Sequence, residues 1–358
     1  MTKKLHMVQI GCGYWGPNLV RNFLRNKEIE RYVVCDNDQR MLSKISSEFS
    51  NVETSLDSRR FLNDPTIDAV VVALPAGMHS EFARHALLAN KHVFIEKPMA
   101  MNTEDARELI RIGREKNKLI MVGHTFIYNS AVRRVKKYID DGELGRIYYI
   151  FSQRLNLGKI RQDVNAMWNL APHDVSIILY WLDAQPNDIS ATGRSFLQDG
   201  IEDLVFINLG FKSHQSAHIH VSWLDPCKTR KMVIVGSKKM LIYDDVSAEN
   251  KITIFDKGID KSLKNDLKHE IYDYARFNLE NRVGDIIIPK LDFDEPLKEE
   301  CKHFIECILT QRQPLTNGED GLQVVKILEK AQECLEQKRK KEYTIPPMKN
   351  YPAYQIGA

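Results

Sequence analysis

The order of apolar and polar positions divides the chain into two parts. In the first, up to about residue 123, short β-rich apolar runs alternate with segments of helical periodicity. The apolar runs are Met7–Ile10, Tyr32–Cys35, Ala69–Leu74, Val93–Ile95 and Leu119–Val122, and helices are predicted near 17–26, 39–49, 79–90 and 103–117. This alternation is typical of an α/β fold with a doubly wound parallel sheet, whose strands are buried on both faces.

The pattern changes after Thr125. A helix near 130–140, a strand at 147–151 and a helix from Pro172 to Leu182 precede a series of apolar or alternating segments, at 188–194, 204–211, 216–224, 231–236, 239–244 and 252–256. Two further helices are predicted near 296–311 and 319–338, and residues 257–295 are predicted to form loops with one short helix at most. We therefore predict a first domain at 1–124 and an α+β domain at 125–358 with an open, mostly antiparallel sheet.

A glycine-rich turn follows the first apolar run. It reads Gly11-Cys12-Gly13-Tyr14-Trp15-Gly16, and Asp36 ends the second apolar run. The glycines permit a tight turn, a close approach of backbone N–H groups to a pyrophosphate, and close helix packing. Asp36 can accept hydrogen bonds from the adenosine ribose, whereas a 2′-phosphate would face its charge. The motif predicts a Rossmann domain that prefers NAD to NADP.

Other polar residues stand at the carboxyl ends of the predicted strands. Leu74-Pro75 follows one strand and Glu96-Lys97-Pro98 follows another, so both join the glycine loop at one crevice. A lysine partly removed from water beside a positively charged nicotinamide has a lowered pKa and can exchange a proton with a substrate hydroxyl. A surface Lys–Glu pair is the alternative. The Lys97–Pro98 bond is a candidate for the cis form.

A third motif, Trp168-Asn169-Leu170-Ala171-Pro172-His173-Asp174, lies in the second part of the chain. If its helix begins early, Asn169 and His173 are one turn apart and face the same cleft. Histidine is the usual acid or base near neutral pH. A histidine that hydrogen-bonds a backbone group at the helix terminus is an equal alternative.

Charge and cysteine usage exclude several classes of function. The net charge is +3, and the basic run Lys338–Lys341 ends a predicted helix, so we predict no nucleic-acid binding. Six cysteines without a C-x-x-C pair, no signal-peptide core and no membrane-length apolar run predict a cytoplasmic protein without a membrane partner. His214, His218 and His220 lack a carboxylate or cysteine at a suitable offset, so we predict no metal site.

The glycine motif, the Pro75 and His79 pair, Glu96-Lys97-Pro98 and Pro172-His173 resemble the Gfo/Idh/MocA family of NAD(P)-dependent oxidoreductases. The resemblance implies an N-terminal Rossmann domain and a C-terminal domain that supplies the substrate site and the oligomer contacts. It makes Lys97 the catalytic lysine and His173 the histidine of the family's D-x-x-x-H motif. Asn169 stands where that motif usually has Asp.

Together these motifs define the expected site. The residues expected to bind the cofactor are Gly11, Gly13, Tyr14, Trp15, Gly16, Asp36, Asn37, Leu74, Pro75, His79, Glu96, Lys97 and Trp168. Those expected to bind substrate are Lys97, Tyr128, Asn129, Arg161, Asn169 and His173. Arg154 and Arg161 offer bidentate donors to a carboxylate or phosphate, with surface salt bridges as the alternative.

The predicted activity is hydride transfer between NAD and a secondary alcohol or ketone carbon of a sugar. Residues 158–174 are similar to members that act on nucleotide-linked sugars, of the UDP-N-acetylhexosaminuronate type, at the 3-position in polysaccharide or glycoconjugate synthesis. A 3-ketoreductase of a deoxysugar nucleotide, an inositol or free-sugar dehydrogenase, and a non-catalytic NAD(H)-binding sensor remain as alternatives. We also predict a homodimer or homotetramer through the open sheet, whose outer face is expected to carry Phe206, Ile219, Val221 and Trp223.

Overall fold

The computed structural model describes residues 4–158, 160–262 and 278–343. Its first unit is a six-stranded parallel sheet in the order β3-β2-β1-β4-β5-β6, the strand order of a Rossmann fold. The strands are β1 (Leu5–Ile10), β2 (Ile29–Cys35), β3 (Glu53–Ser55), β4 (Ala69–Val72), β5 (His92–Glu96) and β6 (Ile120–Gly123). The helices are α1 (Gly16–Leu24), α2 (Gln39–Glu48), α3 (Ser58–Leu62), η1 (Ala76–Met78), α4 (His79–Leu88) and α5 (Thr103–Glu115).

Burial explains why these segments form a doubly wound sheet. Every residue of β4, β5 and β6 is buried, as expected for strands covered by helices on both faces. Several helices begin at a side-chain cap, where Asp38, Asp57 or Asn102 accepts a backbone N–H of the first turn. The short polar strand β3 and helix α3 were not predicted, because β3 has no apolar run and lies at the sheet edge.

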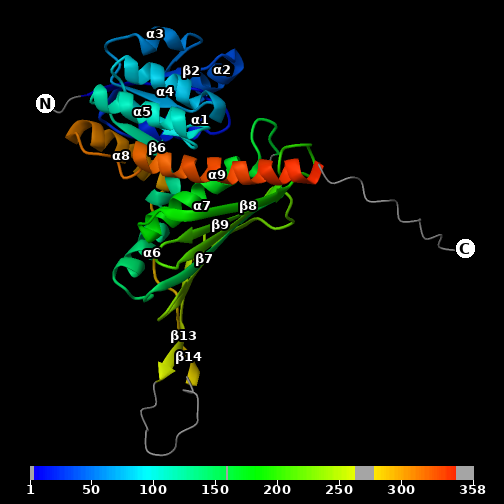
Figure 1. Cartoon of the computed structure of the whole chain (residues 1–358). Coiled ribbons are helices and arrows are strands. Elements are labelled where there is room, and N and C mark those ends of the chain that lie inside the picture. Colours follow the sequence, from blue (N-terminus) through cyan, green and yellow to red (C-terminus); the bar gives the residue numbers. More distant parts are fainter. Residues whose placement is uncertain (1–3, 159, 263–277, 344–358) are drawn as a thin grey trace, which may run out of the picture.

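The second unit is an eight-stranded sheet in the order β14-β13-β12-β11-β7-β10-β9-β8 (Figure 1). Its strands are β7 (Ile147–Leu155), β8 (Pro186–Arg194), β9 (Leu204–Phe211), β10 (Ser216–Ser222), β11 (Thr229–Gly236), β12 (Met240–Asp244), β13 (Ile252–Ser262) and β14 (Asn278–Ile287). All neighbouring pairs are antiparallel except β7 and β10. The predicted open, mostly antiparallel sheet is confirmed. The helical elements before α8 are η2 (Thr125–Tyr128), α6 (Ser130–Asp140) and α7 (Ala166–Leu182).

Two predictions in this unit were wrong. Helix α7 begins at Ala166 and not at Pro172, because the Asn165 side chain accepts the Trp168 N–H and caps an earlier start, with Pro172 inside the helix. Part of the region predicted as loops, 257–295, forms the end of β13 and all of β14, which project from the body as a hairpin (Figure 1). Residues 263–277 of that region lie outside the described residues. These strand segments were not predicted because their polar residues interrupt the apolar alternation that is typical of a strand.

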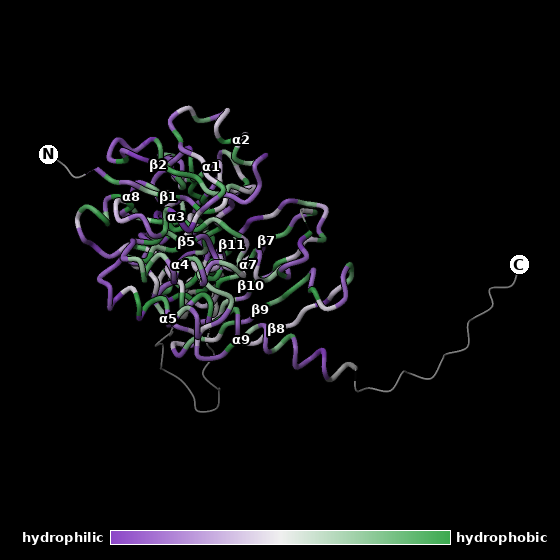
Figure 2. The backbone as a smooth tube through the Cα atoms, turned by 90° about the horizontal axis from the view of Figure 1, so that it is seen from above, coloured by the Kyte–Doolittle hydropathy of each residue, from purple (hydrophilic) through white to green (hydrophobic). Residues whose placement is uncertain are grey.

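The last two helices return to the first unit. Helix α8 (Pro296–Thr310) packs against α1, and α9 (Gly318–Tyr343) packs against α5, α7 and β8, so it lies between the two sheets (Figure 1). Hydrophobic positions gather inside the body and hydrophilic ones toward its periphery (Figure 2). Because α8 and α9 come late in the chain but pack on the first unit, the domain boundary at residue 124 stays a prediction. Among the described residues, no helix combines the length and apolar character needed to cross a membrane.

The outer face of the second sheet differs from the prediction. Ile219, Val221 and Trp223 are buried, and α7 packs on their side of the sheet. Phe206 does lie on the outer face, where it is 41% exposed. The pairing of β9 with β10 places Phe206 opposite His220, and residues directly opposite share a face. The outer face therefore carries His218 and His220, and the apolar residues that alternate with them, Ala217, Ile219 and Val221, point inward.

Candidate active site

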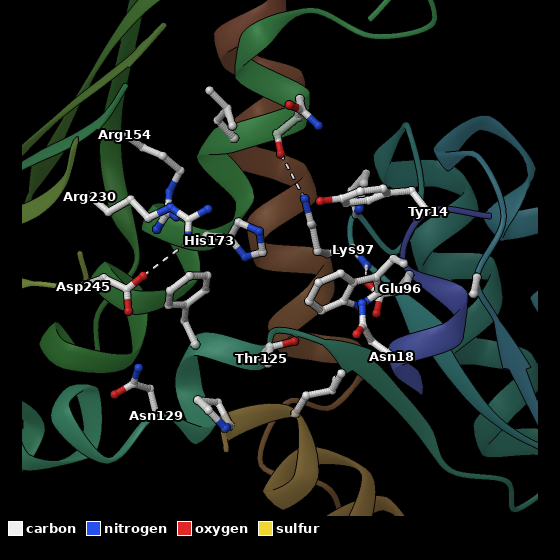
Figure 3. Close-up of a pocket in the computed structure, with 18 of the residues that line it drawn as sticks. Tyr14, Asn18, Glu96, Lys97, Thr125, Asn129, Arg154, His173, Arg230 and Asp245 are labelled. Atoms are coloured by element: carbon white, nitrogen blue, oxygen red, sulfur yellow. Dashed lines mark hydrogen bonds and ion pairs between the residues drawn. The ribbon is translucent and has the colours of Figure 1, made fainter. Parts of the chain in front are cut away.

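A cavity of about 730 Å³ opens between the two units. Residues from the carboxyl ends of the first-sheet strands line one side, and residues of η2, α7 and the second sheet line the other (Figure 3). Eleven of the expected site residues line it, namely Tyr14, Trp15, Leu74, His79, Glu96, Lys97, Asn129, Arg161, Trp168, Asn169 and His173. The predicted convergence of separate loops on one crevice is therefore present.

The glycine loop at the edge of this cavity suits a dinucleotide. Gly11 has φ +97°, and a Cβ there would lie 2.3 Å from the Ala73 carbonyl oxygen, so only glycine fits. A Cβ on Gly13 would meet nothing within 4 Å, which leaves open space above the loop. The loop leads into the N-terminus of α1, where the helix dipole favours a phosphate. These residues fit NAD.

The Asp36 carboxylate is fixed beside the glycine loop. One oxygen accepts the Cys12 N–H at 2.8 Å, and the other accepts the Asp38 N–H at 3.0 Å. Asn37, next to it, is exposed. Two oxygens held by backbone donors still have lone pairs for a ribose diol, and their charge opposes a 2′-phosphate.

His79 connects two of the loops around the cavity. Its ring nitrogens lie 2.7 Å from the Leu74 and the Pro98 carbonyl oxygens. Burial lowers the pKa of His79. Pro98 follows a cis peptide bond, the form considered from the sequence. The imidazole therefore fixes the spacing between the loops that follow β4 and β5.

Lys97 reaches across the cavity to the second unit. Its ammonium group donates to the backbone carbonyl of Asn169 at 2.9 Å (Figure 3). Burial lowers the pKa of Lys97 to about 8, although the neighbouring Glu96 carboxylate acts in the opposite direction. Burial also raises the pKa of Glu96 to about 7. Both groups therefore exchange protons near neutral pH, which a surface Lys–Glu pair would not do.

His173 lies inside α7 with its ring at the cavity wall. Its Nδ1 atom is buried and has no hydrogen-bond partner, so a ring satisfied there by a backbone group, the alternative considered from the sequence, is not found. The ring packs edge-on against Phe126, with centroids 4.9 Å apart. Burial, followed by the charges of Lys97 and Arg154, holds the pKa of His173 well below its usual value. His173 is therefore neutral at physiological pH.

Asn169 lies one turn before His173 on the same helix, as the spacing predicted. Its side-chain oxygen accepts the Trp223 indole N–H at 3.2 Å. An amide at this position brings no negative charge toward the imidazole. The neutral state of His173 agrees with the absence of a carboxylate at position 169.

The far side of the cavity is rich in basic groups. Arg154 forms a buried ion pair with Asp174 at 2.7 Å. Arg230 pairs with Asp245 at 3.3 Å, and the Lys251 ammonium group donates to the Asp245 carbonyl at 2.9 Å. Sequence reasoning missed Arg230, Asp245 and Lys251, since no local motif marks them and only the order of strands β11 to β13 brings them together.

Two expected substrate residues behave differently from each other. Tyr128 is buried behind the cavity wall, where its hydroxyl lies 3.1 Å from the Thr316 hydroxyl. It does not line the cavity. Asn129 does line the cavity and also caps α6 through the Ala131 N–H.

Arg161 lines the cavity with its guanidinium paired to Asp163 at 2.8 Å.

Comparisons with known proteins agree with this geometry. Residues 5–124 match the oxidoreductase family with an NAD-binding Rossmann fold, and residues 132–242 match the Gfo/Idh/MocA C-terminal domain. Myo-inositol 2-dehydrogenase of Thermotoga maritima is 22% identical over 92% of this chain and 96% of its own length. A dTDP-3,4-didehydro-2,6-dideoxy-α-D-glucose 3-reductase of Saccharopolyspora spinosa is 34% identical over 41% of this chain and 44% of its own.

The fold also matches solved structures. UDP-N-acetylglucosamine 3-dehydrogenase GnnA of Acidithiobacillus ferrooxidans superposes with a TM-score of 0.75 at 20% identity, covering 93% of this chain and 98% of the other. The two family matches cover residues 5–124 and 132–242. The chain belongs to the Gfo/Idh/MocA family of NAD-dependent oxidoreductases.

Proposed function

We propose that this enzyme transfers a hydride between NAD and the 3-position of a nucleotide-linked sugar, in polysaccharide or glycoconjugate synthesis. The position of Lys97 carries the proposal. A buried amine with a pKa of about 8 stands at the mouth of the nucleotide crevice, within hydrogen-bond reach of the second unit. Mere binding of NAD(H), as in a sensor protein, does not require such a group.

The chain's own residues divide the work as follows. Lys97 binds the reacting oxygen and takes or returns its proton. Neutral His173 hydrogen-bonds the same hydroxyl or accepts its proton, and Asn169 and Asn129 orient the sugar. NAD supplies the redox chemistry through its nicotinamide. Asp36 and the glycine loop hold the cofactor, and the charge of Glu96 favours the protonated form of Lys97.

The shape and charge of the cavity favour a long, anionic substrate. The cavity of about 730 Å³ must also take the nicotinamide, so the charge of its far side is the stronger argument. Arg161, Arg230 and Lys251 lie on its far side, where a diphosphate or a sugar carboxylate would find cationic donors. The S. spinosa reductase and GnnA carry nucleotide-sugar names, which supports this class. A 3-ketoreductase is the same chemistry run in reverse, and the T. maritima relative keeps an inositol substrate as the second candidate.

A screen of substrates tests this proposal. NAD or NADH is mixed with UDP-sugars, keto-sugars and inositols, and nicotinamide absorbance is followed. We expect a change with a UDP-linked N-acetylhexosamine or its uronate, and none with the Lys97→Ala variant. A response confined to inositols or free sugars would favour the second candidate. Tight NADH binding without turnover of any compound would favour the sensor.

We also propose a homodimer or homotetramer that forms through the outer face of the second sheet. Phe206 and Tyr149 are each 41% exposed there, and Phe151 and Val233 are half-buried beside them. These residues lie on three strands, β11, β7 and β9, and β10, which lies between β7 and β9, carries His218 and His220 on the same face. An exposed sheet face that combines apolar and aromatic side chains in this way favours association of identical subunits. The six cysteines are free, which fits a cytoplasmic enzyme.

A further inference from the structure

Behind the cavity, helix α8 carries a carboxyl group that the proposed mechanism does not use. Glu300 is completely buried, and its Oε2 accepts the Thr125 hydroxyl at 2.7 Å. Its Oε1 has no hydrogen-bond partner, and no basic side chain of the described residues forms a salt bridge with it. An isolated buried carboxylate is costly, so the neutral acid is favoured.

A second carboxyl group, at the end of β5, lines the cavity. Glu96 Oε1 is also buried without a partner, and Oε2 accepts the Lys97 backbone N–H at 3.3 Å. Glu96 pairs with Gly123 in the sheet, and a Cβ on Gly123 would lie 3.2 Å from both carboxylate oxygens. Thr125, whose hydroxyl donates to Glu300, comes two residues after Gly123, so this short segment connects the surroundings of the two acids. The two acids are close enough that the charge of Glu96 adds to burial in raising the pKa of Glu300.

We propose that Glu300 is a positioning residue for the reaction at Lys97. It remains a neutral carboxylic acid and directs its proton toward the Glu96 carboxylate, directly or through one ordered water, so that the negative charge of Glu96 is held facing Lys97. Thr125 already donates to Oε2, which leaves Oε1 as the oxygen that carries the proton. One proton then satisfies both orphaned oxygens.

The other groups around Glu300 leave Glu96 as the charge it faces. Tyr128 on η2 and Cys301 on α8 have pKa values raised by burial, so both are uncharged at neutral pH. His124, after β6, is neutral because burial lowers its pKa to about 3. Arg21 and Arg25 of α1 are paired with Glu295 at the start of α8.

The arrangement has a consequence for Lys97, which rests on the proposed function. The Glu96 charge raises the pKa of Lys97 against the effect of burial. Without a proton donor at position 300, the Glu96 carboxylate keeps the Lys97 N–H on Oε2 but loses the hydrogen bond to Oε1 and becomes neutral more easily. Lys97 then loses its counter-charge and deprotonates at lower pH. In contrast, an amide at position 300 still donates to Glu96 and accepts from Thr125.

The experiment compares wild type with Glu300→Gln and Glu300→Leu. The infrared difference spectrum of wild type minus Glu300→Gln at pH 7 should show the C=O stretch of a protonated carboxyl, and this measurement needs no substrate. In sugar oxidation, kcat/KM of Glu300→Gln should follow the wild-type pH profile. The limb that reports Lys97 should move down by about one pH unit in Glu300→Leu.

Two results would overturn the inference. One is a difference spectrum without a protonated-carboxyl band, which would mean that Glu300 is ionised. The other is a pH profile of Glu300→Gln displaced from wild type, which would mean that the acid acts through its charge. Thermal unfolding and NADH fluorescence titration check that each variant is folded, and the Gln variant decides alone if the Leu variant does not fold. A band without turnover of any sugar would count against the proposed function and not against this inference.

Discussion

At the scale of single residues, we propose that Asp36 decides which dinucleotide fits. Its two oxygens are held by the Cys12 and Asp38 N–H groups, so the carboxylate is rigid before the cofactor arrives. We predict that Asp36→Ala weakens NADH binding and narrows its advantage over NADPH, because the ribose diol loses an acceptor and the 2′-phosphate no longer meets a charge. Fluorescence titration of both cofactors measures this. Tighter binding of NADPH than of NADH by the unmodified enzyme would refute the electrostatic argument.

Position 169 tests how the neutral state of His173 arises. A carboxylate one turn before the imidazole favours its charged form, so Asn169→Asp should raise the pKa of His173. The acidic limb of the kcat/KM profile should then move to higher pH, since the histidine stays protonated longer. His173→Ala should impair turnover less than Lys97→Ala does. An unchanged profile in Asn169→Asp would show that burial alone sets the protonation state of His173.

The residues of the site were predictable where a local motif marks them. The glycine loop, Lys97, Asn169 and His173 were found because each belongs to a short pattern at a strand or helix end. Arg230 and Lys251 carry no such pattern, and Glu300 resembles an ordinary solvated charge on an amphipathic helix until the fold buries it. Tyr128 was misplaced, because one turn of η2 separates the cavity wall from the interior.

At the scale of elements, we expect two glycines of the turn between β1 and α1 to be needed for different reasons: Gly11 for packing and Gly13 for ligand binding. An alanine Cβ at Gly11 would lie 2.3 Å from the Ala73 carbonyl oxygen, in a backbone conformation that alanine rarely adopts. Gly11→Ala should therefore lower the melting temperature, by several degrees for a loss of about 2 kcal/mol or more. Calorimetry measures this loss.

Gly13 is the matched control in the same loop. A Cβ there contacts nothing within 4 Å, so Gly13→Ala should keep the wild-type melting temperature. It should instead weaken NADH binding, because the added methyl group occupies the space that the pyrophosphate approaches. Equal loss of stability in the two variants would remove the distinction between these glycines.

The elements show where sequence patterns stop being informative. Five strands of the first sheet were predictable, because they are continuous apolar runs, whereas the short polar strand β3 was not. In the second sheet the strands were found, but the face of each depends on register, and a shift of one residue exchanges the faces. That is why Ile219 and Trp223 were assigned to the wrong side. Strand β14 was missed because its sequence alternates weakly and its partner β13 lies beyond a long intervening segment.

At the scale of the whole molecule, we propose that the outer face of the second sheet determines the oligomeric state. Phe206→Asp places a charge on this face, so we predict that it shifts the enzyme from oligomer to monomer. Leu56→Asp is a suitable control, because Leu56 is 57% exposed on the first unit, away from the sheet. Light scattering at micromolar concentration measures the masses. A wild-type monomer would contradict the proposed interface.

The central claim is that Lys97 transfers the proton while NAD carries the hydride, and turnover of Lys97 variants tests it most directly. Lys97→Arg keeps the positive charge but cannot release a proton near neutral pH. We predict that Lys97→Ala and Lys97→Arg both lower kcat by about two orders of magnitude or more. Their dissociation constants for NADH should remain close to that of wild type. Near-normal turnover in either variant with the true substrate would contradict the account.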